Sequence, residues 1–191
     1  YVKRAQGTAF KYNRKWPDGR RPGFTFGTQL RDNLFWTFCS GLPLWTLWEV
    51  VTLWAFANGW IAGLDPSVNP IWFGVLWFFV PILHECHFYW IHRMIHWPPI
   101  YARVHKIHHR NVNPGPWSGL SMHPIEHLIY FSGYLIYWVI PAHPLHFVHL
   151  GLMAGLSPAK GHTGFDRVEI GKEKSLHLPY YAHYLHHRHH M

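Results

Sequence analysis

The sequence predicts an all-α membrane protein with about four transmembrane helices, arranged as two hairpins below a cytoplasmic histidine-rich cap. Three observations lead to this fold class. Hydrophobic residues make up 49% of the chain and gather in long runs, whereas charged residues make up only 14%, against about 25% in average soluble domains. The Lys and Arg residues all lie outside those runs. Most of the 19 histidines lie near the ends of the runs.

Four apolar runs are the candidate membrane spans. A membrane helix needs about 20 apolar residues to cross a hydrocarbon core of ~30 Å, and the first three runs reach that length. The fourth is shorter, so we expect it to cross obliquely or to dip into the bilayer and return. Pro43 is expected to kink the first helix, and Pro98 and Pro99 are expected to end the second. The runs are 34–62, 71–91, 120–140 and 145–158.

The 17 Lys and Arg residues divide the loops into two sides. They fall in segments 1–33, 92–110 and 160–188, whereas the turns 58–70 and 141–144 carry none. Four crossings place the three basic segments on one side and the two bare turns on the other. Cytoplasmic loops carry the excess of Lys and Arg. We therefore expect the histidines to face the cytoplasm, from a bacterial inner membrane or the endoplasmic reticulum.

Two regions are expected along the chain. Residues 1–33 form a basic N-terminal arm along lipid headgroups, with Trp16, Phe24 and Phe26 as interfacial anchors. Residues 34–191 form a single membrane-embedded domain, which we expect to continue beyond the last residue of the sequence. The net charge of +8 could suggest nucleic-acid binding. Membrane spans separate the basic segments, however, so we expect a membrane surface and no nucleic acid as the partner.

Eleven histidines have positions that suit metal binding. Residues three or four apart on a helix share one face, and neutral imidazole is a common ligand for iron, copper, zinc and nickel. A single tetrahedral zinc needs four ligands, so eleven candidates suit two metal ions with one or two histidines left to support the ligands. The candidates are His92, His96, His105, His108, His109, His123, His127, His162, His183, His186 and His187.

Two carboxylates near these histidines are expected to act in the same site. An ionised carboxylate inside an apolar run is costly and usually functional or paired. Glu85 lies about two helical turns before His92 and shares its face, so it could accept a hydrogen bond from that imidazole and fix its tautomer. Glu126 could do the same for His123 or His127.

The second apolar run ends in an acidic residue, an aromatic pair and His-Arg-x-x-His, at Glu85, Tyr89-Trp90 and His92 to His96. The motif His-x-x-His-His follows at His105 to His109 and returns at His183 to His187. This set of motifs resembles the fatty acid hydroxylase/sterol desaturase superfamily. The resemblance covers roughly residues 70–191 and includes the segments 117–126 and 161–165.

The resemblance implies an integral membrane oxidoreductase that holds two iron ions and uses O2 and external electrons to hydroxylate or desaturate a lipid. The electrons would come from a redox partner such as a cytochrome b5-like protein, a ferredoxin or a reductase. Sterols, fatty acyl or sphingolipid chains and carotenoids would all fit as substrates. By match to the motifs, the ligands would be the histidines of the three boxes, with His162 and either His123 or His127 completing the set.

Two other functions stay open on the sequence alone. One is a metal-binding membrane protein without oxidase activity, such as a transporter. Transport requires polar residues at mid-span, whereas the candidate ligands here gather at one face. The other is a structural subunit of a larger membrane assembly that keeps the oxidase fold, because intact ligands do not prove turnover.

Overall fold

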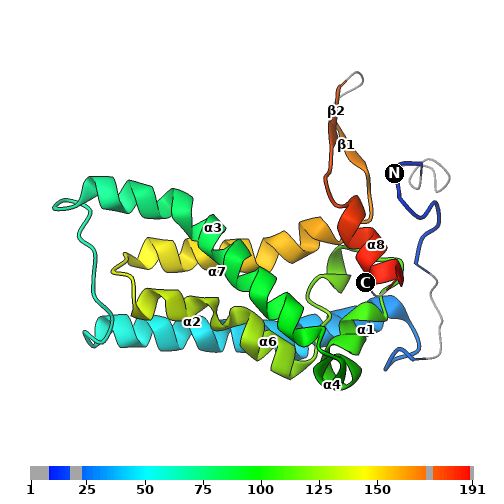
Figure 1. Cartoon of the computed structure of the whole chain (residues 1–191), viewed down its shortest axis with the longest axis horizontal. Helices are drawn as coiled ribbons and strands as arrows, with labels where there is room; N and C mark the ends of the chain where they lie inside the picture. The colour runs from blue at the N-terminus through cyan, green and yellow to red at the C-terminus, as the bar shows by residue number, and fades with distance from the viewer. Residues whose placement is uncertain (1–8, 18–22, 171–173, 190–191) are drawn as a thin grey trace.

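The computed structural model describes residues 9–17, 23–170 and 174–189. It is an elongated helical body with a cap at one end, and the last helix of the chain lies on that cap (Figure 1). The mostly helical character predicted from the sequence is confirmed. The body consists of α2 (Leu42–Ala57), α3 (Pro70–Ile95), α6 (Pro124–Tyr130) with its 3₁₀ continuation η4 (Phe131–Trp138), and α7 (Pro144–Gly161).

The cap is built from short elements that connect or follow the helices of the body. Helix α1 leads into the body through the π-helical turn η1, and α4, η2 and α5 follow one another directly after α3. Their bounds are α1 (Gln29–Trp36), η1 (Thr37–Gly41), α4 (Pro98–Ile100), η2 (Tyr101–His105), α5 (Lys106–His109), η3 (Pro116–Ser118), β1 (Arg167–Ile170), β2 (Lys174–His177) and α8 (Tyr181–His189).

All four predicted spans fall on helical segments that pack together in the body. Within the described part of the chain, however, only α3 is both long and apolar enough to cross a membrane. Its outward side chains are strongly apolar, since Phe78 is 76% exposed and Trp90 69% exposed. Segment 131–138 is wound as a 3₁₀ helix and α7 is interrupted by polar residues. Four crossings and a cytoplasmic cap therefore stay a prediction.

A π-helical turn precedes Pro43, where the sequence predicts a kink. The amide of Leu42 donates to the carbonyl of Thr37, five residues earlier, instead of the usual four. Proline lacks an N–H and its ring clashes with the preceding turn of a regular helix, and π turns are a common way to accommodate such a break. The first helical segment therefore continues through Pro43 into α2.

Three packed aromatic side chains, Tyr134, Tyr137 and Phe147, are almost fully buried at the centre of the body. Their polar atoms have partners, because Trp45 Nε1 donates to the Tyr134 hydroxyl at 3.2 Å and Tyr137 donates to the carbonyl of His146 at 2.6 Å. A buried hydroxyl without a partner would cost about 1–3 kcal/mol. Glycines on α7 let the indole of Trp45 approach the helix backbone closely.

Substitution of Gly155 by alanine is expected to destabilise the body by about 1–3 kcal/mol, the usual cost of overpacking. A Cβ atom at this position would lie 2.4 Å from Cη2 of Trp45. Thermal unfolding of the detergent-purified protein measures the effect. Gly74→Ala is the matched control, because a Cβ there meets nothing within 4 Å. Equal midpoints for the two variants would contradict the packing argument.

The prediction of an all-α protein is wrong in one segment. Strands β1 and β2 form an antiparallel hairpin that stands out from the cap (Figure 1), with Arg167 opposite His177 and Ile170 opposite Lys174. The sequence of β1 alternates polar and β-branched residues, Arg-Val-Glu-Ile, which is the strand period rather than the helix period. The hairpin carries no apolar run, so it escaped an interpretation based on membrane spans.

The described part of the N-terminal arm packs on the cap. Lys11 forms a β-bridge with Phe165 and is only 4% exposed. The Tyr12 ring stacks on Tyr184 of α8 with a centroid distance of 5.3 Å. Of the predicted anchors, Trp16 and Phe26 are exposed, whereas Phe24 is buried, with the Arg110 guanidinium 5.9 Å from its ring centroid.

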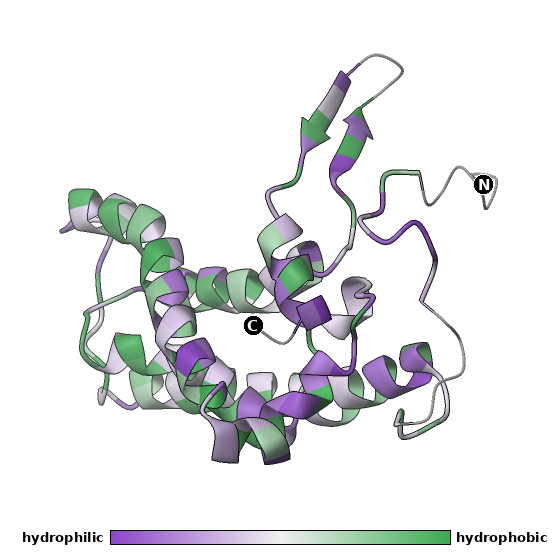
Figure 2. Cartoon of the chain, turned by 45° about the vertical axis from the view of Figure 1, so that its right-hand side comes forward, coloured by the Kyte–Doolittle hydropathy of each residue, from purple (hydrophilic) through white to green (hydrophobic). Residues whose placement is uncertain are grey.

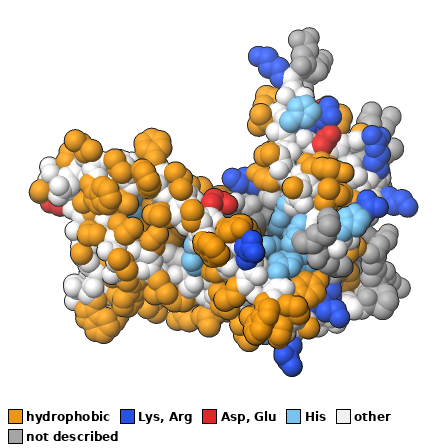
Figure 3. All heavy atoms as spheres, viewed as in Figure 1, with side chains coloured by type: hydrophobic (Ala, Val, Ile, Leu, Met, Phe, Trp, Pro, Cys, Tyr) orange, Lys and Arg blue, Asp and Glu red, His pale blue; other side chains and the backbone are white. Residues whose placement is uncertain are grey.

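Polar and apolar side chains separate along the long axis of the molecule. The ribbons of the body are mainly hydrophobic and those of the cap mainly hydrophilic (Figure 2). On the face shown in Figure 3, the Lys, Arg and His side chains gather at the cap, while hydrophobic side chains cover the body. The charge distribution along the sequence is therefore repeated in space, which supports a body in lipid and a cap in water.

Candidate metal centre

Two groups of four histidines bring their ring nitrogens together in the cap, each within a span of 4.8 Å. Cluster A consists of His92, His96, His105 and His186. Cluster B consists of His108, His162, His183 and His187. His109 adjoins cluster A, because its Nε2 lies 3.1 Å from Nε2 of His105. Nine of the eleven predicted ligands are thus close together.

Helix ends from four parts of the chain supply these side chains. His92 and His96 lie one turn apart at the end of α3, where the sequence reaches Pro98 and Pro99 and the helix cannot continue. The residues of the second motif lie on η2 and α5, and His162 caps the end of α7. Helix α8 carries the third motif and supplies His186 to cluster A and His183 and His187 to cluster B.

The contacts in cluster B fit a shared cation. Nε2 of His162 lies 3.1 Å from that of His108, 2.9 Å from that of His187 and 3.0 Å from that of His183. A neutral imidazole nitrogen carries one proton or one lone pair, so it cannot form three hydrogen bonds to its equivalents. One metal ion would satisfy them all, since nitrogens at 2.0–2.1 Å from an ion and at right angles are about 3 Å apart.

Cluster A has the same geometry. Nε2 of His186 lies 2.9 Å from that of His92 and 3.1 Å from that of His96, and His105 Nε2 lies 3.1 Å from His96 Nε2. Tetrahedral ligands at the same bond length would be about 3.3 Å apart. The nitrogens of each cluster are therefore close enough to share one metal ion.

The opposite ring nitrogens of three ligands are held by oxygen acceptors. Nδ1 of His105 donates to Glu126 Oε1 at 2.7 Å, His162 Nδ1 donates to the Pro158 carbonyl at 2.6 Å, and His108 Nδ1 lies 3.3 Å from the Ser121 carbonyl. Such acceptors keep the proton on Nδ1 and leave the Nε2 lone pair free for a metal.

Burial keeps the imidazoles of cluster B neutral. Burial, with the neighbouring His187 and His162, holds the pKa of His108 well below its usual value, and the pKa of His162 and of His187 is lowered in the same way. Burial lowers the pKa of His183 to about 4. Only neutral imidazole binds metal, so the low pKa values prepare the cluster for a cation at neutral pH.

Glu126 orients a ligand, but a different one from those that the sequence suggests. It is 2% exposed and its partner is His105, 21 residues earlier in the chain. The prediction that Glu126 holds His123 or His127 is wrong, because the first turn of α6 turns the carboxylate toward η2. Glu85 forms no hydrogen bond with His92 among the described residues; it lines a cavity beside the clusters instead.

His123 and His127 lie outside both clusters, in contrast to the prediction that one of them joins the other histidines. His127 Nε2 donates to the Leu120 carbonyl at 3.0 Å, so its Nδ1 accepts from the Ser40 hydroxyl at 2.9 Å. No lone pair is left for a metal. His123 caps α6, because its Nδ1 accepts from the amide of Ile125. Their four-residue spacing reflects helix capping and packing of α6 against η1.

Substitution of His127 by alanine is therefore expected to leave the metal content unchanged and to lower the stability by about 2–5 kcal/mol, the range for truncating a buried side chain together with its hydrogen bonds. Metal analysis and thermal unfolding of the same preparation separate the two effects. Loss of metal at unchanged stability would show that His127 belongs to the ligand set.

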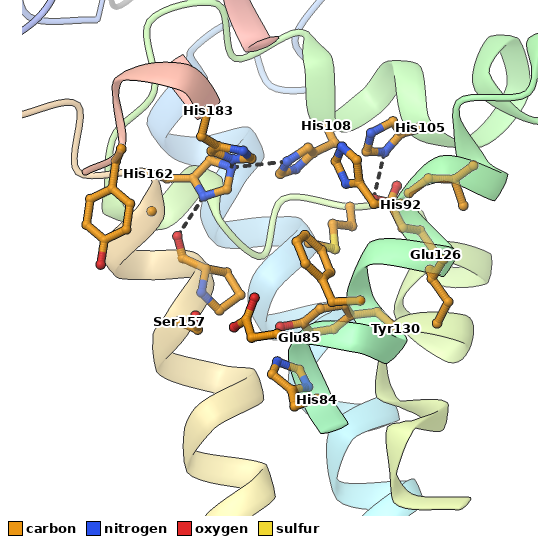
Figure 4. Close-up of a pocket in the computed structure, with 17 residues that line it drawn as sticks. His84, Glu85, His92, His105, His108, Glu126, Tyr130, Ser157, His162 and His183 are labelled. Carbon is orange, nitrogen blue, oxygen red and sulfur yellow. Dashed lines mark hydrogen bonds and ion pairs between the residues drawn. The ribbon is translucent and has the colours of Figure 1, made fainter. Parts of the chain in front are cut away.

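A cavity of about 210 Å³ opens beside both clusters (Figure 4). One wall carries imidazoles of both clusters, including His92 and His162. The rest of the lining is mainly apolar and includes Phe88, Ile91 and Met122. An apolar molecule in this cavity would lie beside the ring nitrogens of both clusters. The contacts of His108 and His162 with the carbonyls of Ser121 and Pro158 could not be predicted from the sequence, because every residue has a backbone carbonyl.

A family model named fatty acid hydroxylase matches residues 77–191, which include both clusters. The chain belongs to this family. Lathosterol oxidase of Mus musculus is 32% identical over 114 residues, covering 59% of this chain and 35% of that protein. C-4 methylsterol oxidase of Schizosaccharomyces pombe is 31% identical over 107 residues, covering 53% of this chain and 35% of that protein.

A further family member, a delta(7)-sterol 5(6)-desaturase of Gibberella zeae, is 36% identical over 55 residues, covering 29% of this chain and 17% of that protein. The chain thus spans about a third or less of the length of these relatives. No solved structure shows a significant match.

Proposed function

We propose that this chain is the core of a membrane di-iron oxidoreductase that uses O2 and electrons from a partner protein to hydroxylate or desaturate a lipid. The three relatives described above are sterol oxidases or a sterol desaturase by name, so a sterol is the first substrate to test. The main support is the cavity in Figure 4, which is lined by imidazoles of both histidine clusters and by apolar side chains.

The residues of the cavity have separate roles in this proposal. Clusters A and B would each hold one iron, and bound iron would supply the oxidising power for an unactivated C–H bond. Phe88, Ile91 and Met122 exclude water and place one carbon of the substrate against the clusters. Glu126 holds the proton on Nδ1 of His105 throughout the proposed reaction.

The position of the cavity suits a lipid substrate and a soluble electron donor. The residues that line the cavity include the ends of α3 and α7, where the mainly hydrophobic body meets the mainly hydrophilic cap (Figure 2). A lipid would enter from the bilayer beside α3, while a redox partner would approach the basic cap from the cytoplasm. The exposed side chains of Arg103 and Lys106 are part of that surface, and positive surfaces attract acidic partners.

Purified protein in detergent tests the proposal. We expect about two irons per chain and, with lathosterol, O2 and a reducing system, an oxidised sterol detected by mass spectrometry. A protein that holds one zinc and no iron would contradict the di-iron assignment. Two irons without oxidation of sterols, fatty acyl lipids or carotenoids would favour a structural subunit of a larger membrane assembly.

A further inference from the structure

Glu85 lies where three hollows of the surface meet. It lines the cavity beside the clusters, together with Phe88 and His92. It also lines a groove between α3 and α8, and a shallow apolar groove on the outer face of α3, the α3 groove, formed by Pro81, Ile82, Cys86, Tyr89 and Trp90. The outer face of α3 and the cavity beside the histidines therefore adjoin at Glu85.

The Glu85 carboxyl group lacks a partner in this setting. In Figure 4 it points into the space between α3 and α7, below His162 and His183. Among the described residues, no hydrogen bond or ion pair involves it. Arg93, the basic residue in the groove, is engaged elsewhere, since it donates to the Tyr89 hydroxyl at 3.1 Å. Glu85 is exposed, and its carboxyl oxygens can accept a hydrogen bond from a ligand in the cavity.

The lining of the cavity restricts the chemistry of that ligand. None of the described residues that line it is Lys or Arg, so a lipid carboxylate placed at Glu85 would meet a second carboxyl group and no basic side chain. A hydroxyl group, in contrast, can donate a hydrogen bond to Glu85. The cavity is small, about 210 Å³, so the carbon facing the clusters would be only a few bonds from that hydroxyl.

Resting on the function proposed above, we propose that Glu85 binds the hydroxyl of a neutral lipid alcohol and thereby selects the substrate and the position of oxidation. The apolar part of the lipid lies along the α3 groove. Glu85 is thus a substrate-binding residue rather than the residue that orients His92.

A pair of lipids that differ only in the hydrogen-bond donor tests this role. Lathosterol and its methyl ether are titrated into the full chain in detergent, and binding is followed by competition with a fluorescent sterol. We expect the alcohol to bind about tenfold more tightly than the ether, the range of one hydrogen bond to a charged group. In Glu85→Leu, the affinity for the alcohol should fall about tenfold, while that for the ether stays unchanged.

Glu49→Gln is the matched control, because Glu49 is an acidic residue of the body that lines none of these hollows; it should keep the wild-type ratio. Equal affinities of the wild type for alcohol and ether would overturn the inference, as would an equal loss of both in Glu85→Leu. A fall in kcat without a change in KM or in the binding ratio would also overturn it and would make Glu85 a proton donor.

Binding separates this inference from the function on which it rests. If the expected ratio is found but neither iron nor oxidation is observed, the oxidoreductase assignment fails and Glu85 keeps its role. If the protein oxidises alcohol and ether with equal KM, the oxidoreductase assignment stands and the role of Glu85 fails.

Discussion

Replacement of His162 by alanine is expected to lower the metal content from about two ions to about one per chain and to abolish turnover. His162 is the centre of cluster B, because its Nε2 lies within 3.1 Å of three other Nε2 atoms. Removal of a direct ligand should weaken metal binding by more than the roughly 10–100-fold that is typical when a group that only hydrogen-bonds to a ligand is removed. Metal analysis of the purified variant measures the first effect and product formation the second.

His177→Ala is the control for this experiment. His177 lies on the exposed strand β2 and belongs to neither cluster, so its loss should change neither metal content nor turnover. If His162→Ala keeps two ions, His162 is a packing residue and the ligand assignment of cluster B is wrong. Thermal unfolding of the variant before and after metal removal shows whether its cap still folds.

Replacement of Glu126 by leucine is expected to weaken metal binding at cluster A by roughly 10–100-fold, with no effect on cluster B. The carboxylate fixes the tautomer of His105 through the 2.7 Å contact with Nδ1. Leucine leaves that N–H buried without an acceptor, and the ring loses its orientation. Competition with a chelator should remove one metal ion early and the second at the wild-type concentration.

Two further variants show whether the loss of metal affinity arises from the missing hydrogen bond to His105. Glu126→Gln keeps an oxygen that can accept from Nδ1, so it should retain most of the affinity that Glu126→Leu loses. Glu169→Leu, on the exposed strand β1, should behave as the wild type. Loss of both metal ions together in Glu126→Leu would indicate general disruption of the cap and would contradict a role specific to His105.

Much of the candidate site was predictable because its information is local. Histidines three or four residues apart share a helix face whatever the rest of the chain does, and eight of the ten selected in this way do converge. His162, which has no such neighbour, joins them. The same rule selected His123 and His127. His127 instead contacts the Ser40 hydroxyl and the Leu120 carbonyl, and His123 accepts from a backbone amide. Spacing alone does not distinguish a ligand from a capping or packing histidine, since both need the same geometry along the helix.

The fold was predictable to a similar extent. Apolar runs, prolines and the charge distribution located the helical segments and the end of α3. The β1–β2 hairpin and the contacts of Lys11 and Phe24 in the cap were missed. The contacts of Lys11 and Phe24 depend on partners distant in sequence. The hairpin pairs residues close in sequence, but it has no apolar run that would mark it.

By itself, the sequence determined a helical chain with an apolar body, a basic side and three histidine motifs of one family. Only the tertiary structure decided how the imidazoles divide into two clusters and which acceptor holds each ring. It also decided that Glu126 faces His105 and that Glu85 faces a cavity. The physical reason is that helix periodicity fixes the direction of a side chain relative to its neighbours in the chain, whereas partners 20 to 90 residues away are fixed by packing of whole helices.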